Sequence, residues 1–206
     1  MVEERGTSVS KPGAATARDE ILARVRSATA TAPAVEYDAP EPSSRPGSVD
    51  LFVDRVEDYK AVVERCTAAD LAARVVAAVE GCSVVVPPGL GIDVPGAVVD
   101  DGLSSMELDA IDAVVTEATV GVAETGTIVL DHRPGQGRRA ITLVPDRHVC
   151  IVRADQVVAD VPDAVALLDP ARPMTWISGP SATSDIELDR VEGVHGPRTL
   201  HVVLVL

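Results

Sequence analysis

Four consecutive residues, Glu124-Thr125-Gly126-Thr127, interrupt an apolar stretch with residue types that a plain strand does not favour. Gly126 permits a positive φ, so a turn here can direct successive backbone amides at an anion while the two threonine hydroxyls add donors. Such a turn would hold a carboxylate or a phosphate. Glu124 could then serve as a general base, or as a nucleophile towards an acyl group. The alternative is a β-bulge or hairpin turn with an exposed glutamate.

A second candidate anion site contains Gly179, Ser181 and Thr183, which follow an apolar run and precede a helical pattern. The first amides of a helix are unpaired and the helix dipole favours negative charge, so a glycine turn with hydroxyls at this position suits an anion. Helix capping is the other common use of these residue types. Ser184 and Glu187 have the spacing of a capping box.

The four histidines supply one more catalytic candidate. His195 lies in a short glycine-containing loop before the last apolar run, and it could act as an acid, a base or an anion donor because the ordinary pKa of histidine is near neutrality. A solvated loop histidine is the alternative. His132, His148 and His201 are not spaced with each other or with cysteine as metal ligands, so no metal site is expected.

The loop at residues 134–139, with the sequence PGQGRR, matches no complete nucleotide-binding motif. It lacks the Lys-Ser/Thr ending of a P-loop and the third glycine of a dinucleotide fingerprint. Its two arginines could close over an acidic ligand. An ordinary hairpin tip is the alternative interpretation.

These candidate residues must be positioned by a core with very few aromatic side chains. Only four of the 206 residues are aromatic, so Val, Leu, Ile and Ala must fill the core, and the β-branched residues among them favour strands. The runs expected to form strands are residues 84–86, 113–115, 120–123, 127–130, 140–144, 149–152, 174–177 and 200–206. Helices are expected at residues 56–66, 68–79, 105–109 and 163–168. This alternation predicts an α/β sheet, partly antiparallel where strands follow each other directly.

The N-terminal quarter of the chain has a different composition. Residues 1–49 are expected to be an extension with one short amphipathic helix, at 19–28, followed by a proline-rich linker. The α/β domain is expected to span residues 50–206.

The charge and the cysteines restrict the partners and the compartment. A net charge of −14 repels phosphate backbones, so no nucleic-acid partner is expected. No apolar run reaches the length of a membrane span or a signal peptide, which favours a cytoplasmic protein with no membrane partner. Cys66, Cys82 and Cys150 fit neither a disulfide framework nor a thiolate metal site, and are expected to be buried free thiols.

Six motifs in order along the chain resemble the lactate utilisation protein C family, which carries a LUD-type domain. They are AETGT at 123–127, GQGR at 135–138, PxxH at 145–148, VRADQV at 152–157, GPSxTxDIE at 179–187 and GVHGP at 193–197. The resemblance covers roughly residues 80–206.

The resemblance implies a three-layer α/β/α sandwich with a mixed sheet, similar to ribose-5-phosphate isomerase, sugar-phosphate deaminases and CoA transferases. It also implies oxidation of L-lactate to pyruvate together with two iron-sulfur partner proteins. Three cysteines cannot supply the four ligands of a cluster, so no cofactor is expected in this chain. The chain would then be a non-cluster subunit that binds a small carboxylate through Thr125–Thr127 and through Gly179, Ser181 and Thr183.

An alternative is a stand-alone enzyme of the CoA-transferase or sugar-phosphate isomerase kind. It would use Glu124 as nucleophile or base, with His195 as helper. The sequence lacks a glycine-rich CoA loop, which favours the subunit hypothesis, and whether the chain is itself an enzyme stays open.

Overall fold

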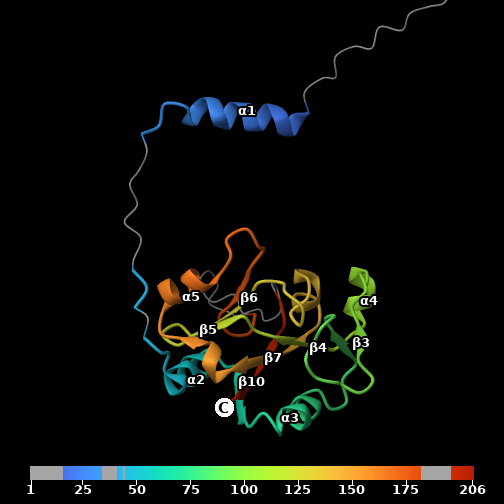
Figure 1. Cartoon of the computed structure of the whole chain (residues 1–206). Coiled ribbons are helices and arrows are strands. Elements are labelled where there is room, and N and C mark those ends of the chain that lie inside the picture. Colours follow the sequence, from blue (N-terminus) through green and yellow to red (C-terminus); the bar gives the residue numbers. More distant parts are fainter. Residues whose placement is uncertain (1–15, 34–40, 44, 182–195) are drawn as a thin grey trace, which may run out of the picture. The chain divides into compact units, whose positions relative to one another are not determined.

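A computed structural model describes residues 16–33, 41–43, 45–181 and 196–206 of the chain (Figure 1). Contacts within the chain divide it into two compact units, residues 1–39 and residues 40–206. The candidate functional residues all belong to the second unit.

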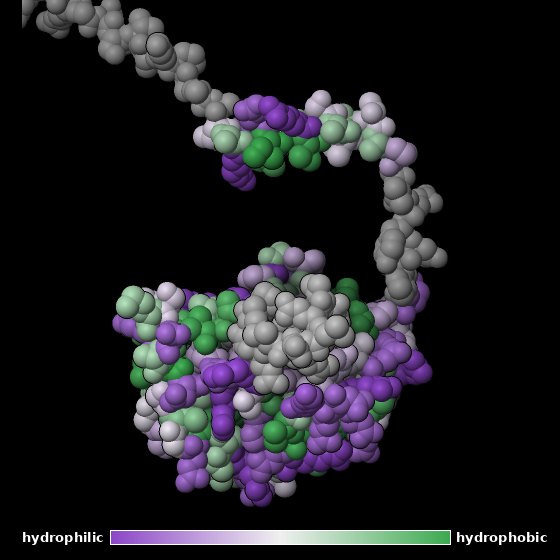
Figure 2. Space-filling model, turned by 180° about the vertical axis from the view of Figure 1, so that it is seen from behind, coloured by the Kyte–Doolittle hydropathy of each residue, from purple (hydrophilic) through white to green (hydrophobic). Residues whose placement is uncertain are grey.

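The described part of the first unit contains helix α1 (Ala17–Thr29). Its first turn is closed by a capping box, in which the Thr16 hydroxyl accepts a hydrogen bond from the backbone amide of Asp19. The helix buries none of its residues, and Figure 2 shows apolar side chains gathered along one side of it, where Ile21 and Val25 are exposed. The amphipathic helix expected at 19–28 is confirmed.

The second unit is built on a six-stranded sheet in which every pair of neighbouring strands is parallel. The strand order is β1-β10-β7-β4-β2-β3. The strands are β1 (Val62–Cys66), β2 (Val84–Val86), β3 (Val98–Val99), β4 (Ala113–Glu117), β7 (Arg147–Arg153) and β10 (Thr199–Val205). The central strands are almost wholly apolar because both faces of a parallel sheet are covered.

A smaller sheet of four strands has the order β8-β5-β6-β9. Its strands are β5 (Val120–Val122), β6 (Thr127–Leu130), β8 (Val157–Val158) and β9 (Thr175–Ile177). Strand β6 is antiparallel to both β5 and β9, whereas β8 is parallel to β5. The antiparallel pairing expected from the sequence therefore occurs in this smaller, mixed sheet.

The larger sheet is the middle layer of the unit (Figure 1). Helix α3 (Leu71–Ala78) packs on one face, where it meets alternate β10 side chains such as Val203. Helix α2 (Val49–Asp58) and the smaller sheet pack on the opposite face, where Phe52 and Ile128 join Val202. The expected α/β class and its layered arrangement are confirmed.

Two shorter helices and two 3₁₀ turns complete the described part of the unit. Helix α5 (Val161–Leu167) packs through Ala164 on the smaller sheet. Helix α4 (Ser105–Asp109) has the expected bounds, is capped by Ser104 and buries Leu108. The 3₁₀ turns are η1 (Arg139–Thr142) and η2 (Ala154–Gln156).

The helix expected at 56–66 is wrong from residue 59 onwards. Helix α2 ends at Asp58, Lys60 adopts a left-handed φ of 65°, and the chain continues as strand β1. The β-branched residues Val62 and Val63 pair with β10, so tertiary pairing outweighs the helical spacing of the apolar residues.

The strand expected at 140–144 is also wrong, because this segment is the 3₁₀ turn η1. One side chain, Ile141, is fully buried against Val85, Leu108 and Val114. Burial of Ile141 is enough to hold this segment against the core, so the segment does not need to pair with either sheet.

Candidate functional site

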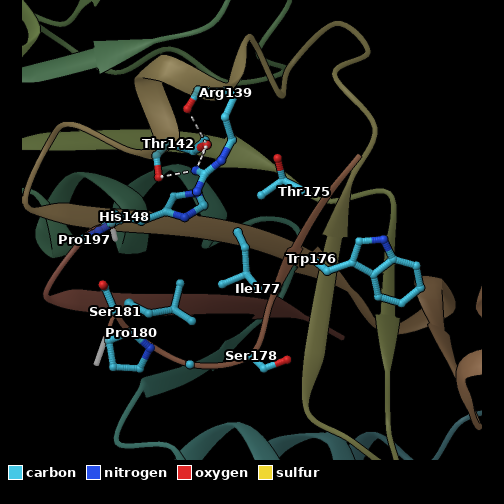
Figure 3. Close-up of a pocket in the computed structure, with 13 residues that line it drawn as sticks. Arg139, Thr142, His148, Thr175, Trp176, Ile177, Ser178, Pro180, Ser181 and Pro197 are labelled. Carbon is cyan, nitrogen blue, oxygen red and sulfur yellow. Dashed lines mark hydrogen bonds between the residues drawn. The ribbon is translucent and has the colours of Figure 1, made fainter. Parts of the chain in front are cut away.

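A cavity of about 230 Å³ lies beside the edge strand β9 (Figure 3). Its walls come from η1, from β9 and the loop that follows it, and from the first residues of β7 and β10. The lining residues are Arg139, Thr142, His148, Thr175, Trp176, Ile177, Ser178, Gly179, Pro180, Ser181, Gly196, Pro197 and Leu200. Polar and apolar groups therefore face the same small space.

The positive charge of this cavity comes from Arg139. Its Nη1 atom donates to the carbonyl oxygen of Thr142 at 3.2 Å and to the hydroxyl of Thr142 at 3.1 Å, and these bonds fix the guanidinium across η1 (Figure 3). The other guanidinium N–H groups have no acceptor within the described part of the chain. A fixed cation with unused donors is suited to a carboxylate.

The back of the cavity contains a neutral imidazole. His148 is 2% exposed, and its Nε2 atom lies 2.8 Å from the hydroxyl of Thr116. Burial, with the nearby charge of Arg139, lowers the pKa of His148 to about 4. The ring is therefore an uncharged hydrogen-bonding group at neutral pH.

Behind His148 lies a buried thiol. The Thr116 hydroxyl also lies 3.7 Å from the sulfur of Cys150, and burial raises the pKa of this thiol to about 12. Cys66 is likewise buried, whereas Cys82 is only partly buried. The expectation of buried free thiols is therefore confirmed for Cys66 and Cys150. A thiol that stays protonated, as Cys150 does, is a poor nucleophile.

The expected anion loop at Gly179 and Ser181 forms one wall of the same cavity. Gly179 has a φ of 84°, and a Cβ atom there would lie 2.5 Å from the Cβ of Tyr59, so only glycine fits. The amide of Ser181 donates to the carbonyl of Pro197 at 2.8 Å. The other two candidates, Thr183 and His195, lie outside the described residues.

The segment Glu124–Thr127 forms the turn between β5 and β6, with Val122 paired to Thr127. Gly126 has a φ of 60°, and a Cβ atom there would lie 2.7 Å from the carbonyl carbon of Arg55 in α2. The glycine thus permits both the turn and its close packing. Glu124 is exposed and lines a different surface cavity, of about 330 Å³.

A chain of hydroxyls nevertheless joins this turn to the Arg139 cavity. The Thr127 hydroxyl lies 2.8 Å from the Thr125 hydroxyl and 2.8 Å from the Ser178 hydroxyl, which lines the cavity. The structure therefore brings Thr127 together with the Gly179 loop. It does not bring Glu124 into the same cavity.

Two lining residues, Arg139 and His148, were not among the site residues expected from the sequence. His148 belongs to the PxxH motif of the resemblance, and Arg139 directly follows the GQGR motif. The sequence suggests Arg139 only as one of two loop cations that could close over an acidic ligand, with a hairpin tip as the alternative, and it gives His148 no role because the spacing does not suit a metal ligand. Their meeting depends on the fold of η1 and the position of β7.

Comparison with known proteins places this geometry in a family. Lactate utilization protein C of Deinococcus radiodurans is 47% identical to the chain over 180 residues, which are 82% of the chain and 84% of that protein. The chain belongs to the lactate utilization protein C family. The LUD domain, which is the family model that matches, aligns with residues 104–205, a range that includes every residue lining the Arg139 cavity.

Other relatives agree with this membership. A crystal structure of a DUF162 family protein from Deinococcus radiodurans matches with a TM-score of 0.64 and 38% identity, and covers 77% of the chain and 96% of that protein. Lactate utilization protein C 1 of Bacillus mycoides is 33% identical over 118 residues, which are 50% of the chain and 50% of that protein. In the part of our chain that the structure describes, no helix is long and apolar enough to cross a membrane.

Proposed function

We propose that the chain is a component of a lactate utilisation system, in which it works with two iron-sulfur proteins that oxidise L-lactate to pyruvate. The role in a lactate utilisation system is supported by the 47% identity with a lactate utilization protein C over most of both chains. The chain has three cysteines, at widely separated positions, whereas a cluster requires about four cysteine ligands. Its role in such a system would be that of a subunit without a cluster.

The proposed ligand is a small carboxylate in the Arg139 cavity. Arg139 offers unused guanidinium donors, and the hydroxyl of Ser178, which also contacts Thr127, lies on the facing wall. Because His148 is uncharged at neutral pH, the arginine supplies the positive charge that a monoanion requires. The side chains of Ile177 and Leu200 provide an apolar surface for a methyl group.

A second proposal keeps the chain as an enzyme that uses Glu124, with His195 as helper. Its support is the accessibility of the Glu124 carboxylate, which lines a cavity together with Arg45 and Asp160. The backbone of Glu124 is held by a hydrogen bond from its amide to the carbonyl of Ala159 at 3.1 Å. An accessible carboxylate on a fixed backbone can act as a base towards a bound ligand.

The deciding experiment measures lactate-dependent dye reduction by the two iron-sulfur proteins, with and without this chain. Arg139→Met tests the first proposal and Glu124→Gln tests the second. Arg74→Met is the matched control, because Arg74 is a half-exposed arginine that pairs with Glu64 on the surface. We expect the wild-type chain and the Arg74→Met and Glu124→Gln variants to support reduction, and Arg139→Met to lose at least ten-fold.

Loss of activity in Glu124→Gln, with Arg139→Met unaffected, would favour the second proposal instead. A reduction rate that does not depend on this chain would contradict the subunit role. Calorimetric titration of L-lactate into the isolated chain separates binding from turnover, since the carboxylate proposal requires binding without the partners.

A further inference from the structure

A second cavity, of about 500 Å³, lies at the carboxyl ends of the parallel strands β2 and β3. One wall is Pro88 and Gly89, which follow β2, and another is Asp100, which follows β3. The amide of Glu117, at the end of β4, donates to the carbonyl of Gly135 at 2.8 Å and holds a glycine-rich loop beside the cavity. Ligands of open α/β sheets bind outside the carboxyl ends of the strands. The cavity therefore occupies a position that such sheets commonly use for binding.

Two arginines in the wall are each fixed by a buried aspartate. Arg138 donates from Nε and Nη2 to the two carboxylate oxygens of Asp100, at 2.7 and 2.8 Å, and Arg133 pairs in the same two-pronged way with Asp131. The carboxylates are 4% and 0% exposed, whereas the guanidinium side chains are 42% and 47% exposed. Nη2 of Arg138 also donates to the carbonyl of Leu103 at 2.5 Å. The Nη1 groups of both arginines have no acceptor among the described residues.

The ion-pair cluster in the cavity wall carries one excess positive charge, and the Glu117 carboxylate beside Gly135 is paired with Arg153 at 3.6 Å. Arg172 also pairs with Asp131, at 3.5 Å, so three guanidinium groups share the two buried carboxylates. The whole chain carries a net charge of −14, so most of its surface repels a dianion. The local positive excess distinguishes this cavity from the rest of that surface.

The backbone adds donors at the same place. The amides of Gly89 and Gly137, both in the lining, have no acceptor within the described part of the chain. Both glycines have a positive φ, and a Cβ atom on Gly137 would lie 2.4 Å from Cδ1 of Ile141. His132, also in the lining, adopts a φ of 60°, an uncommon value for a residue other than glycine. Backbone strain of this kind is often found at ligand sites.

We propose that this cavity binds the phosphoryl group of a small organic phosphate. Arg133, Arg138 and the backbone of Gly89 and Gly137 line the cavity from separate segments of the chain, and donors from separate segments suit the three oxygens of a tetrahedral phosphoryl group better than the two oxygens of a planar carboxylate. The prolines in the wall, Pro88 and Pro134, offer an apolar surface for the organic part. A cavity of about 500 Å³, against about 230 Å³ beside Arg139, accepts a ligand larger than a three-carbon acid.

The test is calorimetric titration of the full chain with phenyl phosphate and, separately, with inorganic phosphate. The site variant is the double substitution Asp100→Asn and Arg138→Met, which leaves no buried charge without a partner and keeps an acceptor for the amides of Gly102 and Leu103. The matched control is Glu64→Gln with Arg74→Met, a surface ion pair away from the cavity. Arg133→Lys is a second variant, because it keeps the charge beside Asp131 and removes the two-pronged geometry.

We expect one phenyl phosphate per wild-type chain, with an affinity that falls as salt rises, at least ten-fold weaker binding in the double variant and about five-fold weaker binding in Arg133→Lys. The control should bind like the wild type, and inorganic phosphate should bind more weakly than phenyl phosphate. Absence of binding at millimolar concentration, or equal binding by the wild type and both site variants, would overturn the proposal. Loss of phenyl phosphate binding in Arg139→Met as large as in the double variant would place the phosphate in the Arg139 cavity and would also overturn it.

Discussion

The hydroxyl oxygens of Thr127 and Ser178 lie 2.8 Å apart, although 51 positions separate the two residues in the sequence. Pairing of β6 with β9, which sets Ile128 opposite Ile177, brings them together. The bond connects the turn after β5 with a wall of the Arg139 cavity. Two segments that the sequence marks independently as anion sites thus share one line of hydroxyls.

Valine has nearly the same shape as threonine but lacks the hydroxyl. Thr127 is 6% exposed and its hydroxyl has two partners, so Thr127→Val should lower the free energy of unfolding by about 1 kcal/mol. It should also weaken L-lactate binding by releasing Ser178. Urea unfolding and calorimetric titration measure the two effects. Ser178→Ala is the companion variant, and since Ser178 is exposed it should weaken binding with a smaller loss of stability.

His148 should make the protein less stable in mild acid. Its pKa is about 6.5 in the unfolded chain and about 4 in the folded protein, so only the unfolded chain takes up a proton between these values. The stability is therefore complete above pH 6.5 and is lost as the pH falls towards 4. Between pH 7 and pH 5 the loss attributable to this group should be about 2 kcal/mol.

The measurement is the free energy of unfolding at a series of pH values for the wild type and for His148→Gln, which cannot titrate. The variant should show a flatter profile over this range, whatever its absolute stability. His201, whose pKa is also lowered by burial, contributes equally to both proteins and cancels. Parallel profiles would contradict a buried neutral His148.

Gly126→Ala should be much more destabilising than Gly81→Ala. Both glycines have a positive φ, 60° and 76°, and a left-handed alanine costs about 1 kcal/mol at either position. Only at Gly126 would the new methyl group meet the backbone of α2, at 2.7 to 2.8 Å, whereas open space surrounds Gly81. Urea unfolding should give a difference of more than about 1 kcal/mol between the two variants. Equal losses would show that α2 moves aside freely.

Lys60→Gly should stabilise the protein by up to about 1 kcal/mol. Lys60 is exposed and has a φ of 65°, so glycine relieves a left-handed backbone at little cost in contacts. Thermal unfolding is a sufficient readout. Glu57→Gly, within the neighbouring helix α2, is the control and should instead destabilise by about 1 kcal/mol.

Local residue types predicted much of the fold. Most short apolar runs bounded by turn residues became strands, as at β5 and β6 around Gly126, and a short helix follows Ser104 at the expected residues 105–109. The family motifs also predicted the layered α/β class. These features depend on neighbours within a few positions, which the sequence displays directly.

The errors arose where distant partners decide the structure. Val62 and Val63 fit a helical spacing, yet β10 offers them a parallel strand partner. The sequence also did not predict that Arg139 and His148 line one cavity, because the positions of η1 and β7 in the fold bring them together. His148 is a site residue by virtue of its burial and its bond to Thr116, and neither property has a local sequence signal.

Arg138 and Arg139 are adjacent in sequence, yet Arg138 lines the larger cavity and Arg139 the smaller one. His132 and Thr175 make a second connection, since their side chains lie 3.3 Å apart and each lines a different cavity. A ligand that moves Arg138 would therefore also move the backbone of Arg139, and the reverse holds for a ligand that moves Arg139. If binding in one cavity changes the affinity of the other cavity, the reverse change must be equal, because such coupling is reciprocal. The loop at 134–139, which contributes to both cavities, would be the element that carries this coupling.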